Sequence, residues 1–549
     1  MSKLGPRIII MGAGSGGLTC AIALKQKYGY TNFTIYEKFA DVGGTWRSNI
    51  YPGCSSDVTM PVYCLSTELR NWNASHLPQK ELLAYWIELA QKHDIYPHII
   101  FNRLVVSAEW NHDTHLYDII LEDTVTRARS ESTAHVVISA VGILETPRYV
   151  SLPGLENFKG DTFHSARWDY SKELSGKRVG VIGNGASTAQ FVPKLSEDPS
   201  THIIQFCRTQ NWMIPNVLYK RYSKFRRTLF HWFPFLMRVS RWSHFALFES
   251  MYIIIFSNQA TRWLATKLSQ LYMTAVAPSK YHNVIIPNYT LGCKRIIFDS
   301  GYLKALNLSN IQLNYNGIEM VTSDGITTRT GENIPLDVMI FATGYTADTY
   351  PISIKGSTNK TIQKYFEDQG GPKAYLGTVI PGFPNLFLIC GPNITTGHTS
   401  VVWSNEVQVN YIMQLIQPII EADAISIEVS EEAADAYDAK IQKRLSNSVY
   451  MDCNSWYRVG GTGKISNAFP GSSSLFYMWL RKPDWRHFSG IGAESWIKKK
   501  RQTSERLNSL GFLAFAVALG IGIYGYALRG AESAPPLKGW VEATVSYLF

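Results

Sequence analysis

The sequence lacks paired cysteines. Its seven cysteines are spread singly through 549 residues, with no CxxC or CxxxxC pair and none of the ligand spacings that zinc sites use. This pattern excludes a cysteine-built metal centre and a catalytic dithiol, and we expect no metal. We also expect all seven cysteines to be reduced thiols in a protein that faces the cytosol.

The sequence also lacks a concentrated basic surface. Lysine and arginine number 53 against 43 acidic residues, a formal net charge of +10, but no stripe of bases interleaved with aromatic residues stands out. Nucleic-acid binding is therefore excluded as an interpretation. Anionic cofactors and a membrane surface account for the excess more simply.

The N-terminus shows no secretory signal, because a strand pattern begins almost at once. Residues 510–528 form an uncharged apolar run, with Lys498–Arg501 and Arg506 before it and Arg529 after it. About 20 such residues cross a hydrocarbon core of ~30 Å. The stronger positive cluster on the N-terminal side predicts a single-pass C-terminal anchor with the body in the cytosol, and the endoplasmic reticulum is one membrane that fits. The alternative is a terminal helix packed on the body or lying in the membrane interface.

A glycine-rich turn follows the first predicted strand. Arg7–Met11 is an apolar run suited to a buried strand, Leu18–Lys25 is helical in pattern, and a second strand pattern, Phe33–Tyr36, ends at the acid Glu37. Strand, glycine turn, helix, strand and acid in this order are typical of a dinucleotide site, with the acid on a ribose. The turn glycines are Gly12, Gly14 and Gly17.

A loop unusually rich in aromatic residues comes next, from Gly43 to Asp57. One interpretation is a structural loop whose Trp46 and Tyr51 fill a core. The other is a loop that lines a flavin, with Asp57 facing a cationic partner. In the second interpretation the flat rings of the loop pack against the cofactor, and Thr45 and Trp46 are its candidate flavin contacts together with Asp57.

A second glycine turn follows the apolar stretch Lys177–Ile182. The next strand pattern, His202–Cys207, ends in Arg208 and Thr209 rather than in an acid. An arginine at this position suits a 2′-phosphate, because its planar fork binds phosphate bidentately; the alternative is a surface cation. The first turn thus indicates FAD and the second NADPH, the latter held by Gly183, Gly185, Ala186, Ser187, Thr188 and Gln190. Thr188 stands where a third glycine is usual.

The segment between the two turns carries a longer pattern. Phe158, Gly160, His164 and Trp168 form an FxGxxxHxxxW motif, and Gly43–Asp57 contains GGxWxxxxYPGxxxD. Both resemble the signatures of type I Baeyer–Villiger monooxygenases, and matching stretches extend from Gly12 to about Trp479. The missing dithiol argues against the flavin disulfide reductases, the nearest class with two dinucleotide domains.

The resemblance implies roles for further residues. Arg295 falls on the catalytic arginine of the family, with Asp57 as its partner, and Lys294 joins Arg208 at the 2′-phosphate. Ser55 and Ser56 would lie near the nicotinamide. Trp456 is implied near the bound NADPH, and the remaining flavin contacts are Tyr63, Val105 and Val401. The Phe158–Trp168 segment is then a linker that couples NADPH-domain movement to the flavin site, and His164 need not act as an acid or base.

The resemblance also implies an α/β fold with two Rossmann-like domains. We expect residues 1–150 to be the first part of the FAD domain and 151–335 the NADPH domain, with a helical insertion at about 215–280. Residues 336–500 would complete the FAD domain and a C-terminal cap, and 510–528 would be a transmembrane helix. The aromatic-rich insertion would line a substrate entrance, lie on a membrane or be a buried hairpin.

The implied reaction is the FAD- and NADPH-dependent insertion of one oxygen atom of O2 beside a ketone carbonyl, giving an ester or lactone. The aromatic-rich body suggests a hydrophobic secondary metabolite, of polyketide or terpenoid type, as substrate. One alternative is an N- or S-hydroxylating enzyme on the same scaffold. Another is a membrane-tethered flavoprotein that no longer oxygenates. The oligomeric state is not predicted.

Overall fold

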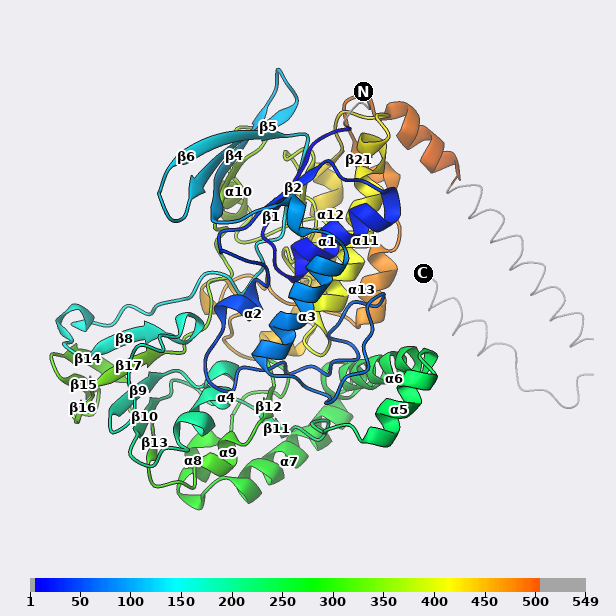
Figure 1. Ribbon diagram of the computed structural model, residues 1–549. Helices are drawn as coiled ribbons and strands as arrows, with labels where there is room; N and C mark the ends of the chain where they lie inside the picture. The colour runs from blue at the N-terminus through cyan, green and yellow to red at the C-terminus, as the bar shows by residue number, and fades with distance from the viewer. Residues whose placement is uncertain (1–4, 504–549) are drawn as a thin grey trace, which may run out of the picture. The chain divides into compact units, whose positions relative to one another are not determined.

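The computed structural model describes residues 5–503, and its first sheet is parallel throughout. The strand order is β19-β7-β1-β2-β3, where β1 is Ile8–Met11, β2 Phe33–Tyr36, β3 Ile99–Ile100, β7 Val136–Ser139 and β19 Leu386–Leu388. All four residues of β1 are buried, because helices cover both faces of a parallel sheet. β19 is the last strand of this sheet in sequence and pairs with β7, so this domain is built from two distant parts of the chain. Figure 1 shows the same arrangement in its helices, where the yellow α11 (Val401–Ile420) lies beside the blue α1 (Ser15–Tyr28).

The second sheet is also parallel, in the order β13-β10-β9-β17-β8. Its strands are β8 (Asp161–His164), β9 (Arg178–Ile182), β10 (His202–Phe206), β13 (Ile311–Asn314) and β17 (Val338–Phe341). Because β17 pairs with both β9 and β8, this domain extends to Phe341. The predicted boundary between residues 335 and 336 is therefore too early, since β17 closes this sheet before the chain returns to the first.

Helices flank the two sheets. In the first domain α1 (Ser15–Tyr28) packs against α11 (Val401–Ile420). The other helices outside the insertion are α2 (Thr45–Ser48), α3 (Gln79–Lys92), α4 (Ala186–Leu195), α8 (His282–Ile285), α9 (Tyr302–Ala305), α10 (Ile362–Asp368), α12 (Glu431–Ser446) and α13 (Ser473–Leu480).

Smaller sheets complete the two domains. A four-stranded sheet in the order β18-β4-β5-β6 belongs to the first, and an antiparallel meander of β14 to β16 belongs to the second. Their bounds are β4 Arg103–Asn111, β5 Leu116–Asp123, β6 Arg129–Ala134, β18 Ser353–Lys355, β14 Ile318–Thr322, β15 Gly325–Thr328 and β16 Asn333–Pro335. Two short pairs remain: β11 (Met213–Pro215) with β12 (Ile297–Asp299), and β20 (Glu428–Val429) with β21 (Phe488–Ser489).

The predicted helical insertion is present. It consists of α5 (Lys224–Trp232), α6 (Phe235–Met251), the π-helix η4 (Tyr252–Ser257) and α7 (Gln259–Val276). It is not a buried hairpin, because many of its large apolar side chains are exposed; Trp232 keeps 72% of its area.

The predicted span at 510–528 lies outside the described residues. Among residues 5–503, no helix combines the length and the apolar character needed to cross a bilayer. The described residues divide into two compact units, the first made of residues 5–483 with His487–Ala493 and the second of Asp484–Arg486 with residues 494–503. Both dinucleotide domains belong to the first unit.

Two cysteines correct the expectation of seven reduced thiols. Cys293 and Cys453 form a disulfide across a sequence separation of 160 residues, with their Cα atoms 6.0 Å apart. Only the fold brings them together, so sequence spacing gave no sign of the pair. Cys20, Cys54, Cys64, Cys207 and Cys390 are free.

Candidate active site

One cavity of about 1310 Å³ is lined by both glycine turns. A site for one small molecule typically measures ~300–1,000 Å³, so this cavity has room for more than one ligand. Its lining runs in sequence from Met11 to Tyr457. The fold thus gathers the two turns, which lie about a third of the chain apart, around a single space.

The first turn leaves the start of α1 open to an anion. Gly14 is the N-cap of α1 and no side chain caps the helix, so its first N–H groups are available to a phosphate. A Cβ on Gly17 would lie 1.9 Å from the Gly12 carbonyl oxygen, which is the close packing predicted for the third glycine. Gly17 allows this close packing but does not line the cavity.

Glu37 is buried at the end of β2, where its carboxylate accepts two backbone N–H bonds. Ala13 N–H donates to Oε2 at 2.6 Å, and Phe39 N–H donates to Oε1 at 2.9 Å. Burial raises the pKa of Glu37, although these two hydrogen bonds oppose the shift. The carboxylate lines the cavity, so its remaining acceptor sites face the place predicted for a ribose.

The aromatic loop packs directly on the first turn. A Cβ on Gly44 would lie 2.7 Å from the Gly14 Cα, so the two backbones meet where residue 44 cannot carry a side chain. Trp46, at the start of α2, contacts Tyr63 edge-on with ring centroids 5.7 Å apart. Both aromatic residues are largely buried and line the cavity, so they fill a core and form a cavity wall at the same time.

The second turn has the same design with one difference. Gly185 is the N-cap of α4, again without a side-chain cap, and a Cβ on it would meet nothing within 4 Å. Thr188, in contrast, is fully buried with its hydroxyl 3.4 Å from the Gly183 carbonyl oxygen. Thr188 does not line the cavity, so the residue predicted among the NADPH contacts packs the helix instead.

Gln190 joins the second turn to the aromatic loop. Its side-chain amide donates to the Ser55 carbonyl at 3.0 Å, and its Oε1 accepts from the Tyr51 hydroxyl at 3.0 Å. Ser55 and Ser56 line the cavity beside it. The loop of the FAD domain is therefore hydrogen-bonded to a helix of the NADPH domain.

Two cations lie beside the end of β10. Lys294 donates to the Thr209 hydroxyl at 2.9 Å, and both residues line the cavity together with Arg208. Burial lowers the pKa of Lys294, and the charge of Arg208 adds to that shift. Two like charges held close together favour an anion between them, as predicted for a 2′-phosphate.

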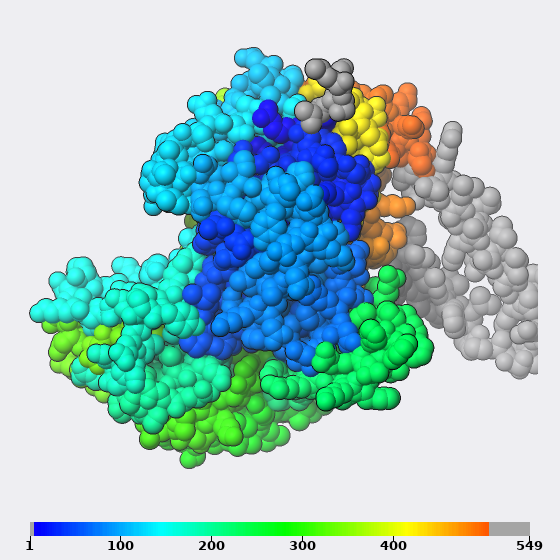
Figure 2. Space-filling model, in the orientation of Figure 1, coloured from blue at the N-terminus to red at the C-terminus, as the bar shows by residue number. Residues whose placement is uncertain are grey.

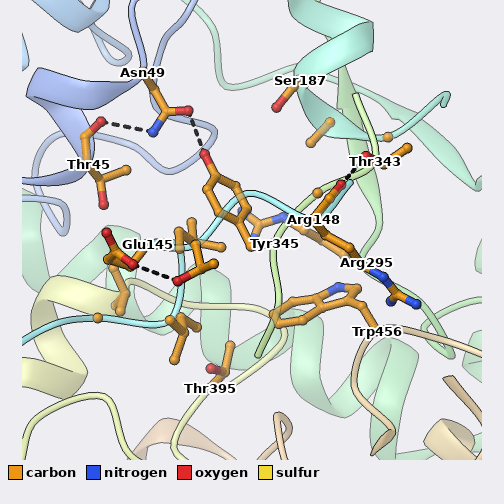
Figure 3. A pocket seen from close by; sticks show the side chains of 18 of the residues that line it. Thr45, Asn49, Glu145, Arg148, Ser187, Arg295, Thr343, Tyr345, Thr395 and Trp456 are labelled. Atoms are coloured by element: carbon orange, nitrogen blue, oxygen red, sulfur yellow. Dashed lines mark hydrogen bonds between the residues drawn. The ribbon is translucent and has the colours of Figure 1, made fainter. Parts of the chain in front are cut away.

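Arg295 forms a salt bridge with Asp57, as the resemblance implied. The charge of Asp57 raises the pKa of the guanidinium further. Burial alone would raise the pKa of Asp57, but the charge and hydrogen bond of Arg295 lower it. Arg295 keeps 42% of its side-chain area open, and because it lines the cavity, a charged donor faces the interior. Figure 3 shows Arg295 and Trp456 extending into this space.

Of the Phe158–Trp168 segment, Arg167 lines the cavity, whereas Phe158, Gly160, His164 and Trp168 lie outside it. His164 ends β8, beside Phe341 of β17, and its Nδ1 accepts the Ala166 N–H at 3.0 Å. Burial and the charge of Arg167 lower the pKa of His164 to about 4, so the imidazole is neutral near pH 7. This agrees with a positioning role, and the coupling function of the segment stays a prediction.

Sequence reasoning missed the connection from this segment to the flavin loop. His164 lies edge-on to Tyr345, with ring centroids 6.3 Å apart. The Tyr345 hydroxyl donates to Asn49 Oδ1 at 2.6 Å, and Asn49 Nδ2 donates to the Thr45 carbonyl at 3.0 Å (Figure 3). The signal that could have revealed this connection is Tyr345 itself, because it directly follows Ala342–Gly344, where the chain was expected to return to the FAD domain.

The cavity holds nearly all of the predicted site residues. Arg295, Asp57 and Trp456 lie on its wall, together with most of the predicted flavin contacts and most of the predicted NADPH contacts. The predicted flavin contacts among them are Gly12, Gly14, Glu37, Thr45, Trp46, Tyr63, Val105 and Val401, and the predicted NADPH contacts are Ser55, Ser56, Gly183, Gly185, Ala186, Ser187, Gln190, Arg208, Thr209 and Lys294. Chemically the wall combines two uncapped helix N-termini, a pair of neighbouring cations and one arginine–aspartate pair.

Known proteins resemble this chain over most of its length. Residues 5–367 match the family described as flavin-binding monooxygenase-like. The FAD-binding monooxygenase ktnD of Aspergillus niger is 33% identical, covering 94% of this chain and 88% of its own length. A Baeyer-Villiger monooxygenase of Pseudomonas aeruginosa is 34% identical, covering 87% and 90%.

Two solved structures share the fold. The closed crystal structure of cyclohexanone monooxygenase superposes with a TM-score of 0.77 at 25% identity, covering 88% of this chain and 98% of that one. An oxidized steroid monooxygenase bound to NADP gives a TM-score of 0.76 at 24% identity, covering 89% and 99%.

Proposed function

This chain belongs to the flavin-binding monooxygenase-like family, and we propose that it is an FAD- and NADPH-dependent Baeyer–Villiger monooxygenase. It inserts one oxygen atom of O2 beside a ketone carbonyl and yields an ester or a lactone. The observation that carries the proposal is that both dinucleotide turns and the Arg295–Asp57 pair line one cavity.

The residues of the cavity fit the two cofactors. The open N-terminus of α1 and the crevice between Gly14 and Gly44 accept a pyrophosphate, and Glu37 accepts from the ribose of FAD. The open N-terminus of α4 and the Arg208–Lys294 pair accept the phosphates of NADPH. Held by these residues, NADPH would supply the hydride and FAD the redox chemistry with O2 that the reaction needs.

Arg295 supplies a fixed positive charge where oxygen becomes negative. Its guanidinium stays protonated at any working pH, and Asp57 holds it in place from one side. It can therefore stabilise both an anionic oxidant and the alkoxide that forms on the ketone carbonyl. Preorganised charge of this kind is worth roughly 3–4 kcal/mol per donor in other active sites.

Asp57 balances the charge of Arg295 before any substrate arrives. Its lowered pKa keeps it ionised, so the pair is already formed in the free enzyme. Tyr63 and Tyr457 are buried close to Arg295, whose charge partly offsets the raised pKa of each phenol. Neutral aromatic walls exclude water, which protects a reactive oxygen species from wasteful collapse.

The substrate we propose is a hydrophobic ketone of the secondary-metabolite kind. Phe248, Met251 and Phe256, from the helical insertion, bring apolar and aromatic side chains to the cavity wall. These residues lie beyond the two dinucleotide turns in sequence and structure, which leaves them to contact a substrate.

A substrate screen tests the proposal. The purified holoenzyme is incubated with panels of ketones, amines and sulfides, and mass spectrometry detects the gain of one oxygen atom with NADPH and with NADH. Esters or lactones formed from ketones with NADPH are expected. Oxygen transfer to amines or sulfides alone would favour a heteroatom hydroxylase, and NADPH oxidation without any oxygenated product would favour a non-oxygenating flavoprotein.

We also propose that residues 510–528 anchor the chain in a membrane, with the catalytic body on the cytosolic side. The support is the uncharged run and the flanking bases in the sequence. Extraction of cell membranes with alkaline carbonate should leave the full chain in the pellet. Release into the supernatant would contradict a span.

A further inference from the structure

The outer surface of the helical insertion is apolar to a degree found nowhere else in residues 5–503. Close to half of the exposed large apolar side chains described fall between Phe225 and Leu271. The three exposed tryptophans, Trp232, Trp242 and Trp263, come one each from α5, α6 and α7. Exposed apolar side chains gathered on one insertion in this way indicate an interaction site. We call this surface, residues 224–271, the insertion face; Figure 2 shows the part of it formed by α5 and α6 in green at the lower right.

The insertion face is exposed although α6 is held firmly in place. Arg241 is buried, donates to the Pro61 and Cys64 carbonyls, and pairs with Glu406 at 2.9 Å. Eight residues further along, Glu249 accepts the Ser473 N–H at 2.8 Å and pairs with His398 at 2.9 Å.

Arg241 and Phe248 are the buried residues of α6, and because they are seven residues apart they lie on one side of the helix and leave the other side facing outward. Phe235, Val239 and Trp242 follow one another at helical spacing on that side and keep 61%, 56% and 64% of their areas. The exposure is thus a consequence of the fold rather than of a loosely packed helix.

The charges on the insertion face are of one sign. Lys224, Arg227, Arg238 and Lys267 are exposed, and Glu249 is the only acid between residues 211 and 280. Because Glu249 is held inward by His398 and α13, no acid of the insertion offsets the four bases. Helices that lie in a membrane interface combine tryptophan, phenylalanine and leucine with lysine and arginine, as this face does. The lysine and arginine side chains favour a bilayer that contains anionic lipid.

Other occupants fit this charge less well. A second copy of the chain, docked face to face, would bring the four bases against four identical bases, which is repulsive. The apolar run 510–528 has bases on both flanks as well. A bilayer that carries negative headgroups offers both an apolar interior and the opposite charge.

We propose that the insertion face is a membrane-docking surface that embeds in the interface of an anionic phospholipid bilayer without spanning it. The inner side of the same helices carries Phe248 and Met251, which line the cavity. Docking therefore places the bilayer on one side of α6 and the cavity on the other. This proposal requires neither the C-terminal span nor the oxygenation chemistry.

The test uses the full-length chain with the apolar run disabled by Phe515→Asp and Leu519→Lys, so that any vesicle binding comes from the described residues. Flotation is measured with phosphatidylcholine vesicles, with and without phosphatidylserine. Binding is expected with phosphatidylserine. Replacing all three tryptophans (Trp232→Ser, Trp242→Ser and Trp263→Ser) should lower vesicle affinity at least about tenfold. Each base replaced by alanine should lower it roughly fivefold.

Two control variants separate docking from unfolding and from general stickiness. The variant with Trp→Phe at the same three positions keeps the apolar face, so it should still bind vesicles. In the parent protein, brominated acyl chains should quench tryptophan fluorescence, and this quenching should be lost in the Trp→Phe variant. Val125→Ser, Met320→Ser and Ile425→Ser remove exposed apolar side chains elsewhere and should leave binding unchanged.

Retained flavin absorbance reports folding for every variant. Equal vesicle binding by the parent and its Trp→Ser variant would overturn the proposal, and so would unchanged quenching in the Trp→Phe variant. A parent that ignores vesicles but dimerises through these tryptophans would overturn it in favour of a second copy.

Discussion

Cys293 and Cys453 are joined by a disulfide that ties together two cavity-lining segments. Cys293 directly precedes Lys294 and Arg295, and Cys453 stands three residues before Trp456. We predict that five thiols, not seven, react with Ellman's reagent in the denatured protein, and that all seven react after reduction. Seven reactive thiols without reduction would show that the bond does not form.

The same bond should matter for stability and for the NADPH site. Disulfides typically contribute about 2–4 kcal/mol to the free energy of unfolding, so Cys293→Ser should unfold at a lower denaturant concentration. The KM for NADPH should rise while bound flavin is retained, because the freed segment carries Lys294. Dithiothreitol should reproduce both effects in the wild type and add nothing in the Cys293→Ser/Cys453→Ser variant.

Replacing Arg295 tests the reaction itself. In Arg295→Ala, Asp57 is left without its partner and the site loses its positive charge, so we expect oxygenated product to fall by at least about 100-fold. Flavin should remain bound, because the substitution leaves the Gly12–Gly17 turn and Glu37 unchanged. Arg295→Lys restores charge without the planar fork and should recover part of the activity. Ester formation by Arg295→Ala at the wild-type rate would remove this residue from the mechanism.

Arg208 should determine the choice between NADPH and NADH. A charge-assisted hydrogen bond contributes about 1.5–3 kcal/mol, so Arg208→Ala should raise the KM for NADPH roughly 10- to 100-fold and leave that for NADH nearly unchanged. Steady-state kinetics with both cofactors measures this. Arg178→Ala is a suitable control, because Arg178 pairs with Asp337 at the opposite end of β9. An equal effect on both cofactors would mean that Arg208 does not contact the 2′-phosphate.

Gly44 should be essential for flavin binding. It has a φ of +51°, and a Cβ there would lie 2.7 Å from the Gly14 backbone, so Gly44→Ala must push apart the two turns that form the crevice. We expect the variant to purify with little flavin. Gly29→Ala is a matched control, with a φ of +59° but nothing within 4 Å of the added Cβ. Full flavin content in Gly44→Ala would contradict the crevice as the pyrophosphate site.

Sequence patterns predicted those parts of the molecule that depend on backbone geometry. The turns at Gly12 and Gly183 require glycine because of how a strand, a turn and a helix meet, and such requirements are local in sequence. The Arg295–Asp57 pair joins residues 238 apart and was accessible only through the family resemblance.

Contacts set by tertiary packing were not predictable in this way. The Cys293–Cys453 bond, the burial of Thr188 and the membership of β17 in the second sheet depend on which distant segments meet. Likewise the face that α6 exposes is decided by partners such as Glu406, which the sequence of the helix does not contain.

His164 gives the folded protein a pH dependence of known sign. Its folded pKa of about 4 lies below the ordinary value of 6.5, so the unfolded chain binds a proton more readily than the folded chain. The stability that follows from this difference is present above about pH 6.5 and is lost as the pH falls toward 4. His76, whose pKa burial also lowers to about 4, acts in the same direction.

Replacing His164 with asparagine isolates the contribution of His164 to the pH dependence of the free energy of unfolding. Asn Oδ1 can accept the Ala166 N–H as His164 Nδ1 does, but it does not titrate. Between about pH 7 and about pH 5, the wild-type free energy of unfolding should fall by about 2 kcal/mol more than that of His164→Asn. Urea unfolding at the two pH values measures the difference, and the variant should keep its flavin because His164 lies outside the cavity. If the two proteins lose stability in parallel, His164 is already protonated in the fold, and a neutral positioning role for it is wrong.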